Sequence, residues 1–196
     1  MSAEPTPRPR RGEGRDALLR AVLRVVDKYG FAGLTYRAVA AEAGVTHGLV
    51  SYHFGSLDAM ISEALALAAD EAIRDSRMVI SSGELAAFAK SISTLVSEQT
   101  EAQTYQYELT FEARRRPELA GQIRALYENY YAVIEHSLIA LGIPRDRALT
   151  RLVFAALDGL VLQQLIFGDA RATDASIEQL QELLALLARN GSSNDG

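Results

Sequence analysis

The stretch HGLVSYHF near the N-terminus concentrates side chains that both donate and accept hydrogen bonds. If this stretch is helical, Val50 and Phe54 fall on one face, and the other face carries small, polar and aromatic residues. His47, Gly48 and Ser51 on that second face are our candidates for contacts to base edges. Gly48 has no side chain, so the helix could lie deep in a groove of DNA. The spacing therefore predicts a helix that packs on one side and recognises DNA with the other.

The residues before this helix form the elements that would position it. Thr35 can cap a first helix, because its hydroxyl accepts a backbone N–H that the helix start leaves unpaired. Val39 and Ala43 give that helix a small buried stripe. Gly44 ends it, since glycine adopts the left-handed conformation that helix C-termini often need, and Thr46 is a second N-cap. Two short helices joined in this way indicate a helix-turn-helix, whose second helix enters the major groove.

Other side chains of the motif suit the thymine methyl groups and the phosphates. Leu49 lies at the margin of the buried face, where it could meet a thymine methyl. Phosphate contacts supply most of the affinity of such proteins and are expected from Arg37, Thr46, Tyr52 and His53. The alternative for His47 and His53 is an ordinary surface or capping histidine.

Residues 35–60, and less closely residues 15–72, resemble the DNA-binding domain of the TetR family of bacterial transcriptional regulators. The family tends to show a threonine that opens the motif, then A-x-x-A-G-V-[ST], an aromatic residue or histidine followed by Phe, and a serine that starts the next helix. The corresponding residues here are Thr35, Ala40-Ala41-Glu42-Ala43-Gly44-Val45-Thr46, His53-Phe54 and Ser56.

This resemblance implies a homodimer that binds double-stranded DNA at a near-palindromic operator and is released by a small-molecule effector in its C-terminal body. Repression is the family's commoner mode. By the same resemblance, Thr46 and His53 contact phosphates. Ser51 and Leu57 depart from the Tyr and Lys that many members carry, so the operator sequence cannot be taken from relatives.

Composition and charge fit this hypothesis. Hydrophobic residues make up 48% of the 196 residues and charged residues 23%, which is ordinary for a globular protein. The net charge of −5 is uneven: residues 1–60 carry eight Lys/Arg against six Asp/Glu, a net +2, and the remainder carries −7. A mildly basic N-terminal part and an acidic remainder suit a protein that contacts DNA phosphates with its N-terminal part only. With no apolar run of membrane-spanning length and no secretory signal, we expect a soluble cytoplasmic protein.

Apolar periodicity and the placement of Gly and Pro predict an all-α chain of about nine helices. We expect a basic arm at 1–12, a helix-turn-helix domain at 13–58 with its motif at about 34–54, a ligand-binding and dimerisation domain at 59–189, and a polar tail at 190–196. Arg8, Arg10 and Arg11 of the arm could reach DNA, or the arm could be a solvated tail. Outside the motif, the expected helices are Arg15–Tyr29, Ser56–Ile80, Glu84–Val96, Glu101–Arg116, Pro117–Leu141, Pro144–Phe167 and Thr173–Arg189.

The predicted domain at 59–189 is rich in tyrosine, whose hydroxyl needs a hydrogen-bond partner when it is buried. Such residues can line a cavity for an amphipathic or aromatic ligand, although core packing is the alternative for each of them. Our candidates are Phe88, Tyr105, Tyr107, Phe111, Tyr127, Tyr131 and Gln163. Asp158 lies among apolar residues and needs a partner, which could be a neighbouring helix, a dimer edge or a ligand.

The last two predicted helices are apolar over more than one face, so each needs partners on two sides. A second copy of the chain can supply the second partner and form a four-helix interface. The alternative is burial within one monomer. The residues expected at this interface are Leu152, Ala156, Leu160, Ile177, Leu180, Leu184 and Leu187.

The sequence argues against an enzyme. It has no Cys, no Gly-rich phosphate loop and no G-x-S-x-G, and none of its three histidines follows a Glu at the spacing of carboxylate-bridged metal sites. We therefore expect neither a cofactor nor a metal. The rival to a ligand-responsive regulator is an all-helical protein-interaction module without a small-molecule ligand.

Overall fold

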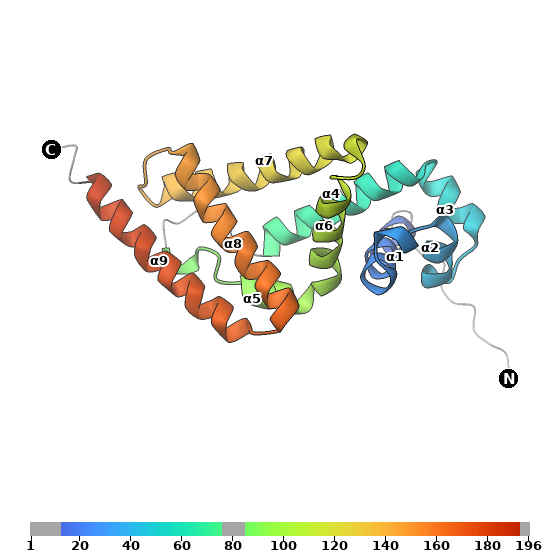
Figure 1. Ribbon diagram of the computed structural model, residues 1–196, viewed down its shortest axis with the longest axis horizontal. Coiled ribbons are helices and arrows are strands. Elements are labelled where there is room, and N and C mark those ends of the chain that lie inside the picture. Colours follow the sequence, from blue (N-terminus) through green and yellow to red (C-terminus); the bar gives the residue numbers. More distant parts are fainter. Residues whose placement is uncertain (1–12, 76–84, 193–196) are drawn as a thin grey trace. The chain divides into compact units, whose positions relative to one another are not determined.

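The computed structural model describes residues 13–75 and 85–192, with the side chains of 13 and of 190–192 left out (Figure 1). Within these ranges the chain is all-α: nine α-helices, two short 3₁₀ helices and no strand. The predicted arm, the predicted end of the long helix beyond Asp75 and most of the predicted tail lie outside the described residues. The chain divides into two compact units, Met1–Leu67 and Ala68–Gly196, and the boundary falls inside helix α4 (Leu57–Asp75).

The first unit is built around α1 (Glu13–Tyr29), which packs against α2 (Tyr36–Ala43), and α2 in turn packs against α3 (His47–Phe54). The short 3₁₀ helix η1 (Phe31–Gly33) follows α1. Apolar residues at helical spacing give each helix a buried face, as the sequence predicts. The side chains that fill this core include Leu18, Val22, Val25, Val39, Val50, Phe54, Met60 and Ile61.

Local capping explains where these helices begin and end. The Thr35 hydroxyl accepts the Ala38 N–H at 3.1 Å, and the Ser56 hydroxyl accepts the Ala59 N–H at 3.0 Å, so both predicted caps are confirmed. Gly44 ends α2 with φ 66° and ψ 31°, the predicted left-handed conformation. The prediction that the Thr46 side chain caps α3 is wrong: Thr46 stands at the N-cap, but its hydroxyl makes no capping bond.

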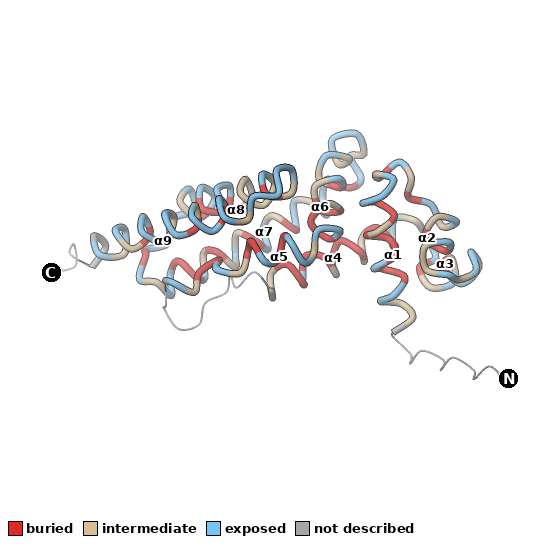
Figure 2. Tube along the Cα trace, turned by 90° about the horizontal axis from the view of Figure 1, so that it is seen from below, coloured by how far each residue is buried: buried red, intermediate tan, exposed pale blue. Residues whose placement is uncertain are grey.

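The second unit holds η2 (Leu85–Ala87), α5 (Ile92–Glu98), α6 (Thr100–Glu112), α7 (Pro117–Ala140), α8 (Arg147–Phe167) and α9 (Ala170–Ser192). Helix α5 packs against α6, α8 and α9, and α8 also packs against α7 and α9. Buried positions recur every three to four residues along one side of α7 and fill most of α5 (Figure 2). The core of this unit therefore lies between these helices.

Four predicted helix boundaries are corrected, and the first is the end of α6, which stops at Glu112 rather than Arg116. The single helix expected at 84–96 is η2 followed by α5, because Ala89 has a φ of 58° and interrupts the helix between them. Helix α8 begins at Arg147 rather than Pro144, because the Asp146 carboxylate accepts the two backbone N–H groups that open it, at 2.8 and 3.1 Å. Helix α9 begins at Ala170, three residues early, where the Asp169 carboxylate accepts the Ala172 N–H at 3.0 Å.

Among the described helices, α8 has the length and apolar composition that could cross a membrane. It also packs against α5, α7 and α9 and carries Asp158 near its middle. Helices of this kind occur in the cores of soluble helical bundles, so the composition of α8 does not indicate a membrane protein.

Candidate functional site

Helix α3 packs with one face and leaves the other open, as its sequence predicts. Val50 and Phe54 are buried against the rest of the first unit. His47, Gly48 and Leu49 are exposed. The largest exposed group is Tyr52, whose residue surface is 83% accessible. The exposed face thus combines an imidazole, a phenol and an apolar side chain around a glycine, a surface on which base edges and phosphates can both be contacted.

The remaining predicted DNA-binding residues surround this face. Arg37 and Thr46 are exposed, whereas Ser51 and His53 are half-buried. A Cβ added to Gly48 would meet no heavy atom within 4 Å, so nothing in the first unit requires glycine there. The His47 ring packs edge-on against the Tyr36 ring of α2, with centroids 5.9 Å apart. These positions are compatible with DNA contact, which stays a prediction for each residue.

An arginine at the start of α1 holds the end of α3. The Arg15 guanidinium donates to both carboxylate oxygens of Glu63 on α4, at 2.8 and 2.5 Å, and to the backbone carbonyl of His53 at 2.9 Å. It also lies over the Phe54 ring, 5.1 Å from the centroid. Sequence reasoning gave Arg15 and Glu63 no role, because a pair 48 residues apart leaves no local signal.

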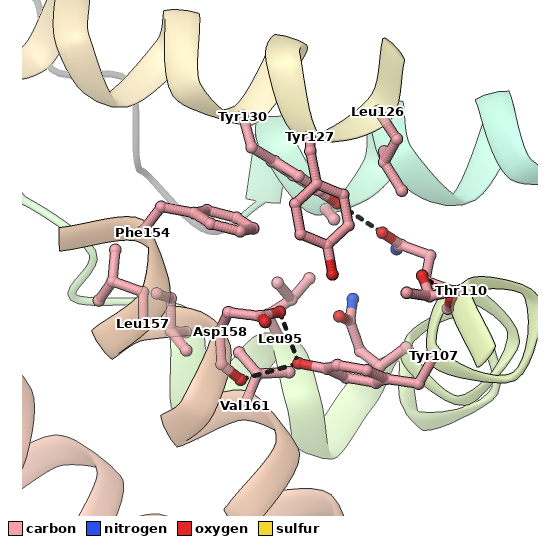
Figure 3. A pocket seen from close by; sticks show the side chains of 14 residues that line it. Leu95, Tyr107, Thr110, Leu126, Tyr127, Tyr130, Phe154, Leu157, Asp158 and Val161 are labelled. Atoms are coloured by element: carbon pink, nitrogen blue, oxygen red, sulfur yellow. Dashed lines mark hydrogen bonds between the residues drawn. The ribbon is translucent and has the colours of Figure 1, made fainter. Parts of the chain in front are cut away.

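The second unit has a partly open cavity of about 50 Å³ between α4, α5, α6, α7 and α8 (Figure 3). One wall is aromatic: Phe154 stacks on Tyr130 with centroids 5.5 Å apart and an interplanar angle of 22°, and it meets Tyr127 edge-on at 5.3 Å. Apolar side chains such as Leu95, Leu126, Leu157 and Val161 complete much of the lining. This volume holds a few water molecules, far less than the several hundred Å³ of a drug-sized site.

Polar side chains interrupt this apolar lining, among them Gln103, Gln106, Tyr107, Tyr130 and Asp158. The Tyr107 hydroxyl on α6 lies 2.9 Å from the Asp158 carboxylate and 2.8 Å from the Asp158 backbone carbonyl, so its proton is shared between them (Figure 3). The Tyr130 hydroxyl donates to the side-chain carbonyl of Gln106 at 2.6 Å. The amide nitrogen of Gln103, a residue only 6% exposed, has no hydrogen-bond partner in the described structure. The cavity therefore contains a carboxylate and a free amide donor.

Burial sets the protonation of these groups. It raises the pKa of Asp158 above its ordinary value, and the Tyr107 hydroxyl partly offsets this by hydrogen bonding to the carboxylate. Burial likewise raises the pKa values of Tyr107 and Tyr130, so both phenols are neutral hydrogen-bond donors at physiological pH. Of the three partners considered for Asp158, the structure shows the neighbouring helix.

The structure brings two of the seven predicted ligand-binding residues, Tyr107 and Tyr127, to this cavity. The other five lie outside its lining, and contact with a ligand stays a prediction for each of the seven. Phe88 and Tyr105 are fully buried in packing elsewhere, and Tyr131 packs on Phe154 without lining the cavity. Phe111 and Gln163 are exposed. The lining residues that the prediction left out include Gln103, Gln106, Thr110, Tyr130, Phe154 and Asp158.

The predicted dimer residues on α8 and α9 divide between surface and core. Leu152 is 67% exposed, Ala156 and Leu187 are exposed, and Leu160 and Leu180 are half-buried. Ile177 and Leu184 are buried within the second unit, so these two predictions are corrected. Large apolar side chains that the prediction left out are also exposed on these helices: Ile166, Phe167, Leu183 and Leu186. An open apolar groove runs between Ala156 and Leu160 of α8 and Leu180 and Leu183 of α9.

No group of three or more potential metal ligands occurs in the described ranges.

Comparison with known proteins assigns both parts of the chain. Residues 18–64 match the family described as bacterial regulatory proteins, tetR family, and residues 83–189 match the tetracyclin repressor-like C-terminal domain.

Full-length relatives agree. The HTH-type transcriptional regulator BetI of Paraburkholderia xenovorans is 28% identical over 88% of this chain and 92% of its own length. The structure of SCO1917, a TetR-family member from Streptomyces coelicolor, is 29% identical, covers 88% of this chain and 98% of its own, and has a TM-score of 0.68. The multidrug binding protein EbrR complexed with proflavin is 31% identical, covers 87% and 99%, and has a TM-score of 0.53.

These matches span the helix-turn-helix unit and the C-terminal helical domain in one chain, and the matched family and the BetI relative are described as regulators. The chain belongs to the TetR family of DNA-binding transcriptional regulators.

Proposed function

We propose that this regulator is a cytoplasmic, dimeric repressor that leaves a near-palindromic operator when a small amphipathic or aromatic effector binds its second unit. The observation that carries the proposal is the aromatic-walled cavity, in whose largely apolar lining lie a carboxylate and an unpartnered amide. Polar groups in such an environment are unfavourable unless something binds them. A protein that needed only a packed core would gain stability by filling this space.

The DNA-binding part of the proposal depends on α3. Its exposed face offers His47 and Gly48 to base edges, while Tyr52 and His53 suit phosphates. Two copies of the chain, joined through the exposed apolar faces of α8 and α9, would present two such helices to one duplex. The operator then has two half-sites whose centres are one helical turn apart, or a multiple of that distance.

The small size of the cavity supports a switch. An effector of drug size does not fit into about 50 Å³, so it binds only a conformation in which the lining has moved apart. A ligand that binds one conformation better than another shifts the population toward it. The conformation described here is then the effector-free one, in which the Tyr107–Asp158 and Tyr130–Gln106 hydrogen bonds link α6 to α8 and to α7.

Helix α4 offers a route from the cavity to the DNA-binding unit. Its residue Ala72 lines the cavity, and the carbonyl of Ala68 accepts the Gln106 amide at 3.4 Å. The same helix begins in the first unit, where Glu63 binds Arg15. An effector that displaces the later turns of α4 would therefore move the first unit of each subunit and change the spacing of the two α3 helices.

Relatives support an aromatic effector. The structures of EbrR were determined with proflavin, ethidium and imidazole, so a protein with this fold binds flat aromatic compounds. The ethidium complex of EbrR is 28% identical, covers 86% of this chain and has a TM-score of 0.61. This structural similarity supports flat aromatic compounds as the class of effector, and it does not identify the compound.

The proposal is tested by a compound screen coupled to operator binding. Compounds that raise the Tm of the protein are titrated into the complex with its operator, and we expect at least one to lower operator affinity at least about tenfold, roughly 1.4 kcal/mol. Val161→Phe fills the cavity and should abolish the Tm increase, whereas Ala132→Phe on the exposed side of α7 should keep it. Stabilising compounds that never change operator affinity would contradict regulation by ligand and favour an interaction module.

A further inference from the structure

We infer that the cavity of the second unit selects an organic cation, with Asp158 as its counter-ion. This inference rests on the proposed function of the cavity as the effector site, and it names the chemical class of the effector. It follows from the charges, the hydrogen bonds and the ring faces around Asp158, considered in turn below (Figure 3).

The first observation is the charge of the lining. Asp158 is the one ionisable carboxylate among the described residues that line the cavity, and no Lys, Arg or His lines it. The rest of the lining is apolar, aromatic or amide. Burial raises the pKa of the Asp158 carboxyl, and no neighbouring cation acts against this rise. The cavity thus has a negative group and no positive one.

The second observation is the incomplete hydrogen bonding of this carboxylate. An ionised carboxylate accepts about four hydrogen bonds, and buried carboxylates usually have a cation or several donors as partners. Asp158 is half-buried, and in the described structure it receives one hydroxyl proton, which Tyr107 shares between the carboxylate and the backbone carbonyl of the same residue. A cation placed beside the carboxylate would act as its counter-ion, and the low-dielectric surroundings would screen the attraction between the two charges only weakly.

The third observation is the aromatic wall. Tyr127, Tyr130 and Phe154 form one cluster, with the ring of Phe154 5.3 to 5.5 Å from its two neighbours. Figure 3 shows the Tyr127 ring reaching from α7 toward Tyr107 and Asp158. Aromatic faces attract cations within about 6 Å, most strongly where water is excluded. In the outer part of this cluster the protein already uses such contacts, because the guanidinium of Arg147 lies 4.6 Å from the Tyr131 centroid.

The fourth observation concerns the other end of the ligand. The Gln103 amide nitrogen is buried, lines the cavity and has no acceptor in the described structure. A ligand with a hydroxyl, ether, carbonyl or ring nitrogen would satisfy it. An anion is disfavoured by repulsion from Asp158, and a neutral hydrocarbon would leave the Gln103 amide without an acceptor and the Asp158 charge without a counter-ion. The site therefore fits an amphipathic cation that carries one acceptor.

Matched probes test the charge preference without knowledge of the natural effector. Benzyltrimethylammonium, its neutral carbon isostere neopentylbenzene, and the anion phenylacetate are titrated into the full-length protein, and binding is measured by calorimetry and by the shift in Tm. We expect the wild-type protein to bind the cation at least about tenfold more tightly than the isostere and to bind phenylacetate weakest. This ratio needs no variant, so it stands even where a substitution unfolds the protein.

Two variants locate the effect. Asp158→Asn should reduce the preference for the cation over the isostere to within about twofold. Asp174→Asn removes the same charge from an exposed position on α9 and should keep the wild-type ratio. The inference is overturned if the isostere binds the wild type as tightly as the cation does, if Asp158→Asn keeps the preference, or if no probe binds.

The operator readout separates this inference from the proposed function. A neutral or anionic probe that binds in preference to the cation and releases the operator would overturn the cation assignment and leave ligand regulation intact. A cation whose binding depends on Asp158 but leaves operator affinity unchanged would support the cation site and contradict the regulatory role.

Discussion

Replacing Arg15 by alanine removes the contacts that hold the end of α3 to α1 and α4. The guanidinium binds the Glu63 carboxylate, the His53 carbonyl and the face of Phe54. The ion pair is worth at most about 1 kcal/mol, because its side chains are 41% and 35% exposed and water screens the charges. The hydrogen bond to the carbonyl adds about 1 kcal/mol and the ring contact roughly 0.5 kcal/mol. We expect the free energy of unfolding to fall by about 2 kcal/mol.

The effect on DNA binding should exceed that of an ordinary loss of stability. If the His53 carbonyl bond fixes α3 in its binding orientation, a loss of about 1 kcal/mol in each subunit of the dimer raises the operator Kd at least about tenfold. Circular dichroism measures the unfolding, and fluorescence anisotropy with labelled operator measures the Kd well below the Tm. Arg15→Lys keeps the charge but loses the forked geometry, so its effect should be intermediate.

Arg147→Ala is the matched control for this prediction. Arg147 also combines an ion pair, with Glu128, and a contact to an aromatic face, that of Tyr131, but it lies in the second unit. It should lower the Tm without changing operator affinity. If Arg15→Ala lowered the Tm and left the operator Kd within twofold of wild type, Arg15 would be a stabilising contact only, and its assigned role in positioning α3 would be refuted.

Three further predictions concern the turn, the buried carboxylate and the dimer. Gly44→Ala should lower the free energy of unfolding by about 1–2 kcal/mol, because φ is 66° at this position. Gly48→Ala should leave folding unimpaired and weaken operator binding, because it places a methyl group in the groove of the DNA. Thermal unfolding and fluorescence anisotropy of both variants measure these two effects. Asp158→Asn should raise the free energy of unfolding at pH 8, because it removes a charge that burial disfavours. This gain should shrink as the pH falls through the raised pKa of Asp158. A gain that grew toward acid pH in denaturant titrations would contradict the effect of burial. Leu183→Glu should cost little in monomer stability, since Leu183 is exposed, yet dissociate the dimer in analytical ultracentrifugation; a variant that remained dimeric would exclude this face as the interface.

Local signals made the first unit predictable. Thr35, Gly44 and Ser56 act on backbone groups within about four residues, so their positions in the chain fix what they cap. The same reasoning failed at Thr46, whose hydroxyl makes no cap, and at Pro144, where the Asp146 carboxylate two residues later starts the helix instead. Where two start signals compete within one loop, the sequence does not rank them.

The cavity was less predictable, because helical periodicity identifies a buried face but not the side chain opposite it. Phe88 and Phe154 are both buried aromatics, yet only Phe154 lines the cavity. Ala89 has a positive φ without being glycine, so no residue type marked the break before α5. Ile177 and Leu184 belong to a helix that is apolar on two faces, and the side that packs inward depends on α5 and α8.

If two copies of α3 together read a symmetric site, a selection from random double-stranded DNA should recover that site. Sequencing of the fragments retained by the full-length dimer should yield a near-palindrome whose half-site centres are one helical turn apart or a multiple of it. The enrichment should fall with Tyr52→Ala, which removes the most exposed side chain of α3. Enrichment of no motif, or of one half-site bound by a single subunit, would contradict the account.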